Sequence, residues 1–468
     1  MSDEAFALDL DRLLALLPHY ASEGPRYTSY PTAPVWGDDY GRDDFRADLG
    51  HEDVDASDGL SLYVHVPYCE SLCHFCACNK VITTDHGRAA SYLDTIEREI
   101  AAVRESVRVP RRATQVHWGG GTPTWLSPDE VRRLHGALVD AFPLSEDAEV
   151  SIEVDPRVTT EAHVEALAAC GFNRISMGVQ DFDAAVQQAI HRIQPADQTA
   201  KLVEQSRAAG FESVNFDLIY GLPYQTVDSF ARTLETLFSI GPDRIALYSY
   251  AHVTWVAKQQ RGFERGDLPD AASKLEIMLT AIRSFLAEGY VFVGLDHFAR
   301  PEDELATALA SRTLRRNFMG HTTQAGVDLI GFGPSAISEL RGSYAQNVRD
   351  PAGWQKAVEE HGVATMRGHR LSADDRARRW VITRIMCHGE VRAGEYEETF
   401  GGVFAGTYAR ELAELARPAE DGLVEIAADG SLRVTPAGRL LVRNLAMPFD
   451  AYLARQRESG ERMFSKTV

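Results

Sequence analysis

The sequence reads Leu62-Tyr-Val-His-Val-Pro-Tyr-Cys69-Glu-Ser-Leu-Cys73-His-Phe-Cys76-Ala-Cys78-Asn-Lys80 where a short apolar run meets a loop with four cysteines. The first three cysteines have the spacing C-x3-C-x2-C, which offers three thiolates to an iron–sulfur cluster. One iron of a four-iron cluster would then lack a protein ligand and could bind a reactant. The spacing therefore predicts a reactive cluster held by Cys69, Cys73 and Cys76.

The cysteine loop has two alternative roles, a structural zinc site and disulfides. Structural zinc usually takes two ligand pairs separated by an intervening segment, and the chain has no second pair. Disulfides are disfavoured by the reducing compartment expected for this chain and by strain within so short a loop. The histidines that could suggest a metal site lack zinc-like spacing, and we expect them to be buried hydrogen-bonding groups: His65, His117, His297 and His321. The remaining cysteines, Cys170 and Cys387, are expected to be unreactive core thiols.

Length and charge limit the class of protein. The 468 residues are 44% hydrophobic, enough for a substantial core in two or three structural units. The formal net charge of −20 argues against general nucleic-acid binding. The first twenty residues are acidic, and no later stretch is apolar enough to span a bilayer, so we expect a cytoplasmic protein without membrane insertion.

Apolar runs and segments of helical period alternate from residue 62 onward. The expected strands are Leu62–Val66, Gln115–Trp118, Glu149–Val154, Arg174–Val179, Ser213–Tyr220 and Arg244–Tyr250. The expected helices lie near 88–105, 128–141, 160–169, 183–190, 197–209 and 227–239. Ser127-Pro128-Asp129-Glu130 has the residues of a helix start. Six successive β/α units predict an α/β fold, a parallel and partly closed barrel with its active site at the carboxyl ends of the strands.

Three domains are expected. Residues 1–58 would form an N-terminal helix and an extended arm, since 24–32 is too rich in Pro, Thr and Ser for a long helix. Residues 59–369 would form the catalytic domain. Residues 370–468 would form a mainly helical C-terminal domain with a small wing, a hairpin around Asp429-Gly430.

The residues resemble the radical S-adenosylmethionine enzymes, and among them the oxygen-independent coproporphyrinogen III oxidases (dehydrogenases). Beside the cysteine loop, the resemblance rests on motifs along nearly the whole chain: Gly24-Pro-Arg-Tyr-Thr-Ser-Tyr-Pro, His117-Trp-Gly-Gly-Gly-Thr-Pro, Ser151-Ile-Glu-Val-Asp-Pro-Arg, Ser176-Met-Gly-Val-Gln-Asp-Phe, Asp217-Leu-Ile-Tyr-Gly-Leu-Pro, Tyr250-Ala-His, Asp296-His-Phe-Ala-Arg-Pro, Arg316-Asn-Phe, Gly333-Pro-Ser-Ala-Ile-Ser and Tyr344-Ala-Gln-Asn.

The resemblance implies a [4Fe-4S] cluster whose open iron binds S-adenosylmethionine, and a 5′-deoxyadenosyl radical that removes a β-hydrogen from a propionate side chain. Loss of carbon dioxide and one electron would leave a vinyl group. Reaction at two propionates of coproporphyrinogen III would give protoporphyrinogen IX in haem biosynthesis. The implied partner is a reducing electron-transfer protein, and we expect a monomer.

The resemblance also assigns two S-adenosylmethionine sites. The residues of the first site are Tyr63, Gly120, Glu153, Ala251 and Ile337. The residues of the second site are Phe75, Gly121, Thr122, Gln180, Arg192 and Asp217. The glycines of Gly119-Gly-Gly-Thr122 are expected to let the backbone approach a ligand without an intervening side chain. Arg192 falls on a short expected helix, where solvent exposure is the ordinary state of an arginine. No catalytic residue is assigned beyond the cluster and the bound S-adenosylmethionine.

The substrate carries four carboxylates, so arginine contacts are expected, and the candidates are Arg26, Arg300, Arg315 and Arg316. Cys78 is expected beside the cluster and not as a ligand. It separates the chain from the related haem chaperones, whose loop usually ends with an aromatic residue. The alternatives left open are a radical methyltransferase that opens haem, a haem-binding chaperone without turnover, and a structural zinc protein.

Overall fold

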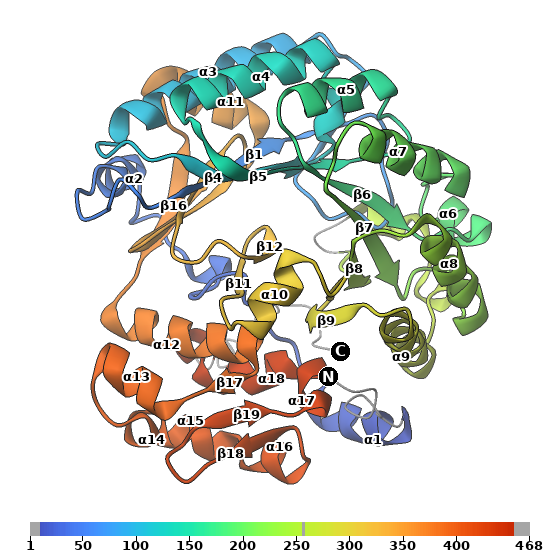
Figure 1. The fold of residues 1–468 in the computed structure, drawn as a ribbon, viewed down its shortest axis with the longest axis vertical. Helices are drawn as coiled ribbons and strands as arrows, with labels where there is room; N and C mark the ends of the chain where they lie inside the picture. The colour runs from blue at the N-terminus through green and yellow to red at the C-terminus, as the bar shows by residue number, and fades with distance from the viewer. Residues whose placement is uncertain (1–9, 255–257, 454–468) are drawn as a thin grey trace. The chain divides into compact units, whose positions relative to one another are not determined.

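The computed structural model describes residues 10–254 and 258–453 (Figure 1). The chain forms two compact units. The sheet unit comprises residues 37–269 and 326–370, and the helical unit comprises the described parts of 1–36, 270–325 and 371–468. The two units divide the chain at other positions than the expected domains, since residues 270–325 group with the two chain ends. The domains 1–58, 59–369 and 370–468 remain a prediction.

Six parallel strands form the centre of the sheet unit, as the sequence predicts (Figure 1). In spatial order they are β1 (Leu60–Val66), β4 (Ala113–Gly120), β5 (Leu144–Val154), β6 (Arg174–Gln180), β7 (Ser213–Tyr220) and β8 (Arg244–Ser249). Apolar residues set the register: Leu62 lies opposite Val116, which lies opposite Val150. This arrangement confirms the expected parallel, partly closed α/β barrel, in which all six carboxyl ends lie at one edge.

The sheet continues beyond β1, where the sequence had suggested no strands. β13 (Asp328–Phe332) pairs parallel with β1, and β14 (Ile337–Leu340), β15 (Ser343–Asn347) and β16 (Thr365–Arg370) follow as antiparallel neighbours. These strands are four to six residues long, too short for a clear alternation of apolar and polar residues.

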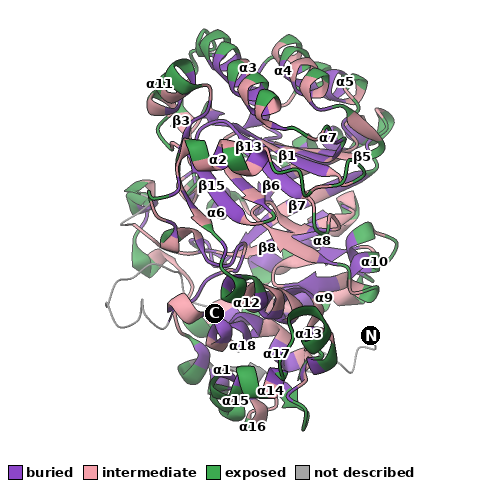
Figure 2. Ribbon diagram, turned by 90° about the vertical axis from the view of Figure 1, so that its left-hand side faces the viewer, coloured by how far each residue is buried: buried purple, intermediate pink, exposed green. Residues whose placement is uncertain are grey.

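Helices cover the outer face of this sheet. They are α2 (Arg42–Leu49), α3 (Arg88–Ser106), α4 (Pro128–Ala141), α5 (Glu161–Ala169), α6 (Ala184–Ala189), α7 (Ala196–Ala208), α8 (Val227–Ile240) and α11 (Pro351–His361). All six expected β/α helices are present. Ser127 caps α4 as predicted, since its hydroxyl accepts from the Glu130 N–H. Figure 2 shows the exposed residues on the outer faces of α3, α4, α5 and α11 and the buried residues along the strands.

Strand β1 illustrates how the two faces of the sheet differ. Leu62, Val64 and Val66 are fully buried. Tyr63 and His65 alternate with them, and successive strand residues point to opposite faces of a sheet. These two side chains therefore lie on the inner face, toward the carboxyl-end site.

The helical unit has its own core. Its helices are α1 (Leu10–Tyr20), α9 (Ala271–Ala287), α10 (Glu304–Ala310), α12 (Ala373–Thr383), a π-helix (Arg384–His388), α13 (Ala393–Phe400), α14 (Phe404–Thr407), α15 (Ala409–Glu414), α16 (Ala416–Glu420), α17 (Pro436–Leu440) and α18 (Val442–Ala446). Its strands are β9 (Val291–Gly294), β10 (His297–Ala299), β11 (Arg315–Asn317), β12 (Gly320–Thr322), β17 (Glu390–Val391), β18 (Val424–Ile426) and β19 (Leu432–Val434). The predicted hairpin is confirmed as β18 and β19.

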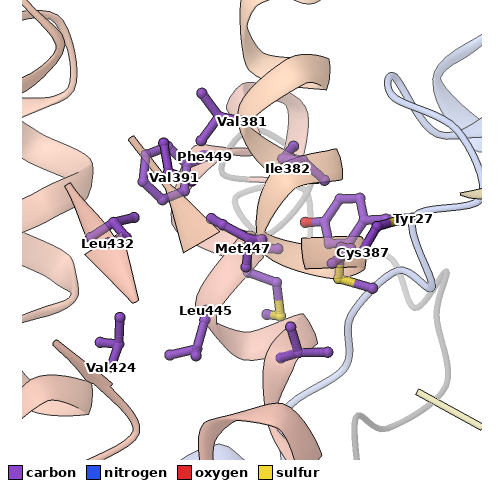
Figure 3. Packing of buried hydrophobic residues seen from close by; sticks show 14 of the residues in the cluster. Tyr27, Val381, Ile382, Cys387, Val391, Val424, Leu432, Leu445, Met447 and Phe449 are labelled. Carbon is purple, nitrogen blue, oxygen red and sulfur yellow. The ribbon is translucent and has the colours of Figure 1, made fainter. Parts of the chain in front are cut away.

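Figure 3 shows Tyr27 of the arm beside Ile382 and Cys387 in this core, which also includes Met447 and Phe449. Cys387 is a core thiol as expected, and burial raises its pKa to about 12. The expectation that Cys170 lies in the core was wrong. Cys170 is only partly buried, because it occupies the C-cap of α5, where the helix reaches the surface. Among the described residues, no helix is both long and apolar enough to cross a membrane.

Candidate active site

The cysteine loop begins in β2 (Tyr68–Cys69), directly after β1, and ends at β3 (Val81–Ile82). The two short strands pair in parallel. The backbone N–H of Val81 donates to the Pro67 carbonyl at 2.7 Å, and that of Thr83 donates to the Cys69 carbonyl at 2.9 Å. Both ends of the loop are therefore fixed to the carboxyl end of β1.

The four cysteines of this loop line one cavity of about 340 Å³ in the sheet unit. The cavity also meets the carboxyl ends of β4, β5, β6 and β7. Of the expected site residues, it brings together Cys69, Cys73, Cys76, Cys78, Phe75, Gly120, Gly121, Thr122, Glu153, Gln180, Arg192 and Asp217. The cavity lies where the strand order predicts a site.

The thiols differ in their surroundings. The hydroxyl of Thr122 donates to the Cys69 sulfur at 3.3 Å, and burial raises the pKa of Cys69 to about 11. A hydrogen bond with the Cys78 thiol, helped by the charge of Lys80, holds the pKa of Cys76 well below its ordinary value. The same contact holds the pKa of Cys78 well above its ordinary value. Of Cys76 and Cys78, Cys76 is thus the thiol that ionises more readily.

Glycine is required at these three positions by close packing within the protein, and not only by the expected approach of the backbone to a ligand. A Cβ at Gly121 would lie 2.7 Å from the Tyr68 carbonyl oxygen. A Cβ at Gly120, where φ is 113°, would lie 2.7 Å from the His65 ring, and one at Gly119 would lie 2.9 Å from the Glu153 carboxylate. The glycines let this turn pack against protein, on the end of β1, and this close packing brings Gly120 and Gly121 to the cavity wall.

A polar network joins the inner faces of β1, β4 and β5. The Tyr63 hydroxyl lies 3.0 Å from His65 Nδ1, and the Tyr63 ring stacks on that of His117. Glu153 accepts from the Gly120 N–H at 3.2 Å and faces His117 Nε2 at 3.5 Å. Burial opposes ionisation of Glu153, but His117 and the Gly120 N–H outweigh it and lower the pKa. A carboxylate is therefore held at the cavity wall.

Arg192 is not a solvated helix residue, because it lines the cavity to which the family resemblance assigns it. Helix α6 ends at Ala189, and His191 adopts a left-handed φ of 56°, which turns the chain inward. The Arg192 side chain is only 7% exposed. Its NH2 group donates to the Gly178 carbonyl at 2.6 Å, while its buried Nε finds no acceptor among the described residues.

Gln180 and Phe75 form two further parts of the wall. Gln180, at the end of β6, is buried with a φ of 68°, a strained conformation for a non-glycine residue. Phe75 packs against an apolar cluster, the residues of which are Val186, Ile190, Ile219, Leu222, Tyr250 and Phe263. This side of the cavity is therefore apolar.

Asp217 has an elevated pKa of about 7, caused first by burial and then by the charge of Glu153. Asn215 Nδ2 donates to its carboxylate at 2.9 Å. Since the folded pKa lies above the ordinary value of 3.8, the carboxyl is protonated in the folded chain and ionised in the unfolded chain between these pH values. Its contribution therefore makes the folded chain less stable as pH rises through this window.

We expect Asp217→Asn to remove this dependence in the ligand-free chain. The variant should gain stability relative to the wild type between pH 4.5 and pH 7.5, by about 2 kcal/mol after allowance for partial exposure. Urea unfolding at the two pH values measures the difference. A difference in stability between variant and wild type that is the same at both pH values would contradict the elevated pKa of Asp217.

Three residues assigned to the first S-adenosylmethionine site do not line the cavity: Tyr63, Ala251 and Ile337. Tyr63 lies behind its wall, in the network with His117. The Ala251 carbonyl accepts from Gln260 Nε2 at 3.1 Å, and Ile337 begins β14.

The four candidate substrate arginines lie in the helical unit. Arg26 pairs with Asp296, and its carbonyl accepts from Arg316 Nε. Arg300 stacks 4.0 Å from the centre of the Tyr290 ring. Arg315 lies 3.3 Å from His388 Nε2. A role of these four arginines with substrate stays a prediction.

The sequence did not identify two charged residues of the site, Asp155 and Arg157. They follow β5 directly, line the cavity and form a bidentate ion pair, with Arg157 NH2 2.7 Å from Asp155 Oδ2. Burial opposes ionisation of Asp155, but Arg192 and Arg157 outweigh it and lower the pKa. The sequence signal that could have identified Asp155 and Arg157 is their position just after a strand, at the catalytic edge of a β/α fold.

Comparison with known proteins identifies the family. The Radical SAM superfamily matches residues 63–237, and the HemN C-terminal domain matches residues 371–441. The oxygen-independent coproporphyrinogen III oxidases of Salmonella typhimurium and Escherichia coli (strain K12) are each 43% identical over 459 residues, 98% of this chain and 99% of the relative. The chain belongs to the oxygen-independent coproporphyrinogen III oxidase family.

A solved structure agrees with this membership of the coproporphyrinogen III oxidase family. The coproporphyrinogen III oxidase (HemN) from Escherichia coli, described as a radical SAM enzyme, is 41% identical and has a TM-score of 0.89. It covers 96% of this chain and 100% of its own. Both units of this oxidase-family chain are thus present in that structure.

Proposed function

We propose that this chain converts coproporphyrinogen III to protoporphyrinogen IX by oxygen-independent oxidative decarboxylation of two propionates. The observation that carries the proposal is the set of cysteines, which open from one loop onto the cavity at the carboxyl ends of the strands. The full-length relatives with this activity in their names support it.

The thiols suit a [4Fe-4S] cluster held by Cys69, Cys73 and Cys76. The described residues contain no group of three or more His, Cys, Asp or Glu side chains that could hold a single metal ion. This gives no support to a zinc site. A four-iron cluster is wider than one ion, so its ligand sulfurs stand farther apart. The donors around the sulfurs, Thr122 and Arg157, also suit thiolates better than thiols.

The cavity walls suit S-adenosylmethionine. When bound, the cluster and S-adenosylmethionine supply the radical chemistry that removes a hydrogen from an unactivated carbon. In the first proposed site, Glu153 offers a carboxylate to an amino or hydroxyl group, with Gly120 beside it. The family pattern adds Tyr63, Ala251 and Ile337, which lie outside the cavity lining. Each of these assignments comes from the family pattern.

In the second proposed site, the unused Nε donor of Arg192 suits a carboxylate, and Asp217 suits a cation or hydroxyl. Phe75, Gly121, Thr122 and Gln180 would complete the wall. The apolar cluster behind Phe75 excludes water from this side. Charged groups on the opposite side then act in a medium of low dielectric constant.

We further propose a cytoplasmic, monomeric enzyme that receives electrons from a reducing electron-transfer protein. Free thiols at a cluster site suit a reducing compartment. The substrate carboxylates would meet Arg26, Arg300, Arg315 or Arg316, which supply positive charge in a chain of net negative charge.

The test is a comparison of two substrates. Reduced, cluster-loaded protein is incubated with S-adenosylmethionine and either coproporphyrinogen III or haem, and products are identified by mass. We expect two decarboxylations of coproporphyrinogen III, 5′-deoxyadenosine as co-product, and no reaction of haem. Turnover of haem alone would indicate the radical methyltransferase, and binding of haem without turnover would indicate the chaperone.

A further inference from the structure

Arg157 is fixed with one edge toward a cluster cysteine. Its Nε donates to Asp155 Oδ1 at 3.0 Å and its NH2 group donates to Asp155 Oδ2 at 2.7 Å. The same NH2 group reaches the Cys73 sulfur at 3.4 Å. The two bonds to Asp155 set the plane of the guanidinium, so its direction toward the sulfur does not depend on a flexible side chain.

A second guanidinium meets the same sulfur. Arg192 NH1 lies 3.1 Å from Asp155 Oδ2 and 3.6 Å from the Cys73 sulfur. Two cations and one carboxylate therefore surround Cys73. By contrast, Cys69 receives a neutral hydroxyl donor from Thr122.

Most of this surrounding is buried, and the Arg157 side chain is 17% exposed. Cys73 and Asp155 are each 7% exposed and Arg192 is 6% exposed. Reduction adds negative charge to an iron–sulfur cluster and to its thiolate ligands. N–H donors and a net positive charge at a ligand sulfur stabilise the reduced form, and burial strengthens this effect.

We propose that Arg157 is a positioning residue that raises the reduction potential of the cluster through its N–H group on the Cys73 sulfur. The inference rests on the proposed function, because it requires a cluster on Cys69, Cys73 and Cys76. It concerns a residue to which neither the motif pattern nor the family comparison assigns a role. Arg192 contacts the same sulfur but also donates to the Gly178 carbonyl, so its replacement would also disturb β6. Replacement of Arg157 therefore tests the effect on the potential more directly.

The experiment is a redox titration of the reconstituted full-length chain without S-adenosylmethionine. Electron paramagnetic resonance measures the fraction of reduced cluster at each potential. Arg157→Gln removes the charge, and Arg157→Lys keeps the charge but loses the planar fork. The matched control is Arg174→Gln. Arg174 is a half-buried arginine on β6 of the same unit, paired with Glu149 and Glu212.

At the potential where half of the wild-type cluster is reduced, we expect Arg157→Gln to lower the ratio of reduced to oxidised cluster about tenfold. For a one-electron couple this is a shift of about 59 mV to lower potential. Arg157→Lys should shift the potential in the same direction by less. Arg174→Gln should match the wild type.

Each other outcome overturns the proposal in a recognisable way. An unchanged potential in Arg157→Gln, with iron and sulfide contents equal to those of the wild type, contradicts the proposal and leaves the proposed function standing. Loss of the cluster from both Arg157 variants but not from Arg174→Gln would show that Arg157 acts in assembly and not on the potential. A wild type that assembles no cluster would overturn the proposed function together with this inference.

Discussion

Replacement of Cys69, Cys73 and Cys76 together by alanine is expected to abolish cluster assembly. After anaerobic reconstitution, the wild type should hold about four iron and four sulfide ions per chain and the triple variant close to none. The reason is that the three sulfurs come from one loop that is anchored at both ends to β1. Decarboxylation of coproporphyrinogen III should fall below detection. Iron and sulfide analysis with visible absorption spectra measures the first effect.

Two single variants are controls for this result. Cys78→Ala should keep the cluster, because Cys78 is read as a neighbour of Cys76 and not as a ligand. Cys170→Ala, at the C-cap of α5, should match the wild type in all respects. A cluster of unchanged spectrum and yield in the triple variant would refute the ligand assignment.

Replacement of Glu99 by alanine is expected to destabilise the chain by about 4 kcal/mol, because it leaves several buried donors without an acceptor. Glu99 lies on α3 and is 2% exposed. Its carboxylate accepts from the Gly333 N–H at 2.8 Å, from Asn347 Nδ2 at 2.7 Å and from Trp354 Nε1 at 3.2 Å. Burial raises the pKa of Glu99 to about 8, although these donors favour the charged form.

The position of Gly333 extends this effect to the site. Gly333 has a φ of 96°, and a Cβ there would lie 2.6 Å from the His65 carbonyl oxygen. The turn that Glu99 fixes therefore packs against the carboxyl end of β1 and leads into β14, which begins with Ile337. Loss of the Glu99 carboxyl group should therefore loosen the turn at Gly333 and the start of β14.

Chemical denaturation followed by circular dichroism measures the stability change. The matched control is Glu105→Ala on the exposed face of the same helix, which should change stability by less than about 0.5 kcal/mol. Equal effects of the two substitutions would contradict the role of Glu99 as a buried acceptor.

The regular part of the fold could be predicted because each central strand is an apolar run between helices of clear period. The expected strand over 213–220 coincides with β7, and the expected helix over 128–141 coincides with α4. The cysteine spacing located the site at the correct edge of the sheet. These features depend on local sequence, so one sequence suffices to predict them.

The contacts and local conformations that the sequence did not predict depend on distant residues. Arg192 turns inward because His191 takes a left-handed conformation and Asp155, 37 residues away, provides its partner. The glycine triplet is required by close packing on Glu153, His65 and the Pro67–Tyr68 backbone, which a local motif does not show. Arg157 carries no signal of its own contact with Cys73, 84 residues earlier.

This site is expected to remove the β-hydrogen of a propionate. The most direct test uses coproporphyrinogen III that carries deuterium at the β-carbons of its propionates, incubated with the reduced, cluster-loaded chain and S-adenosylmethionine. Mass spectrometry of the 5′-deoxyadenosine reports where its new hydrogen originates. We predict deuterium in the 5′-deoxyadenosine, in step with the vinyl groups formed. Unlabelled 5′-deoxyadenosine formed together with vinyl product would contradict the account.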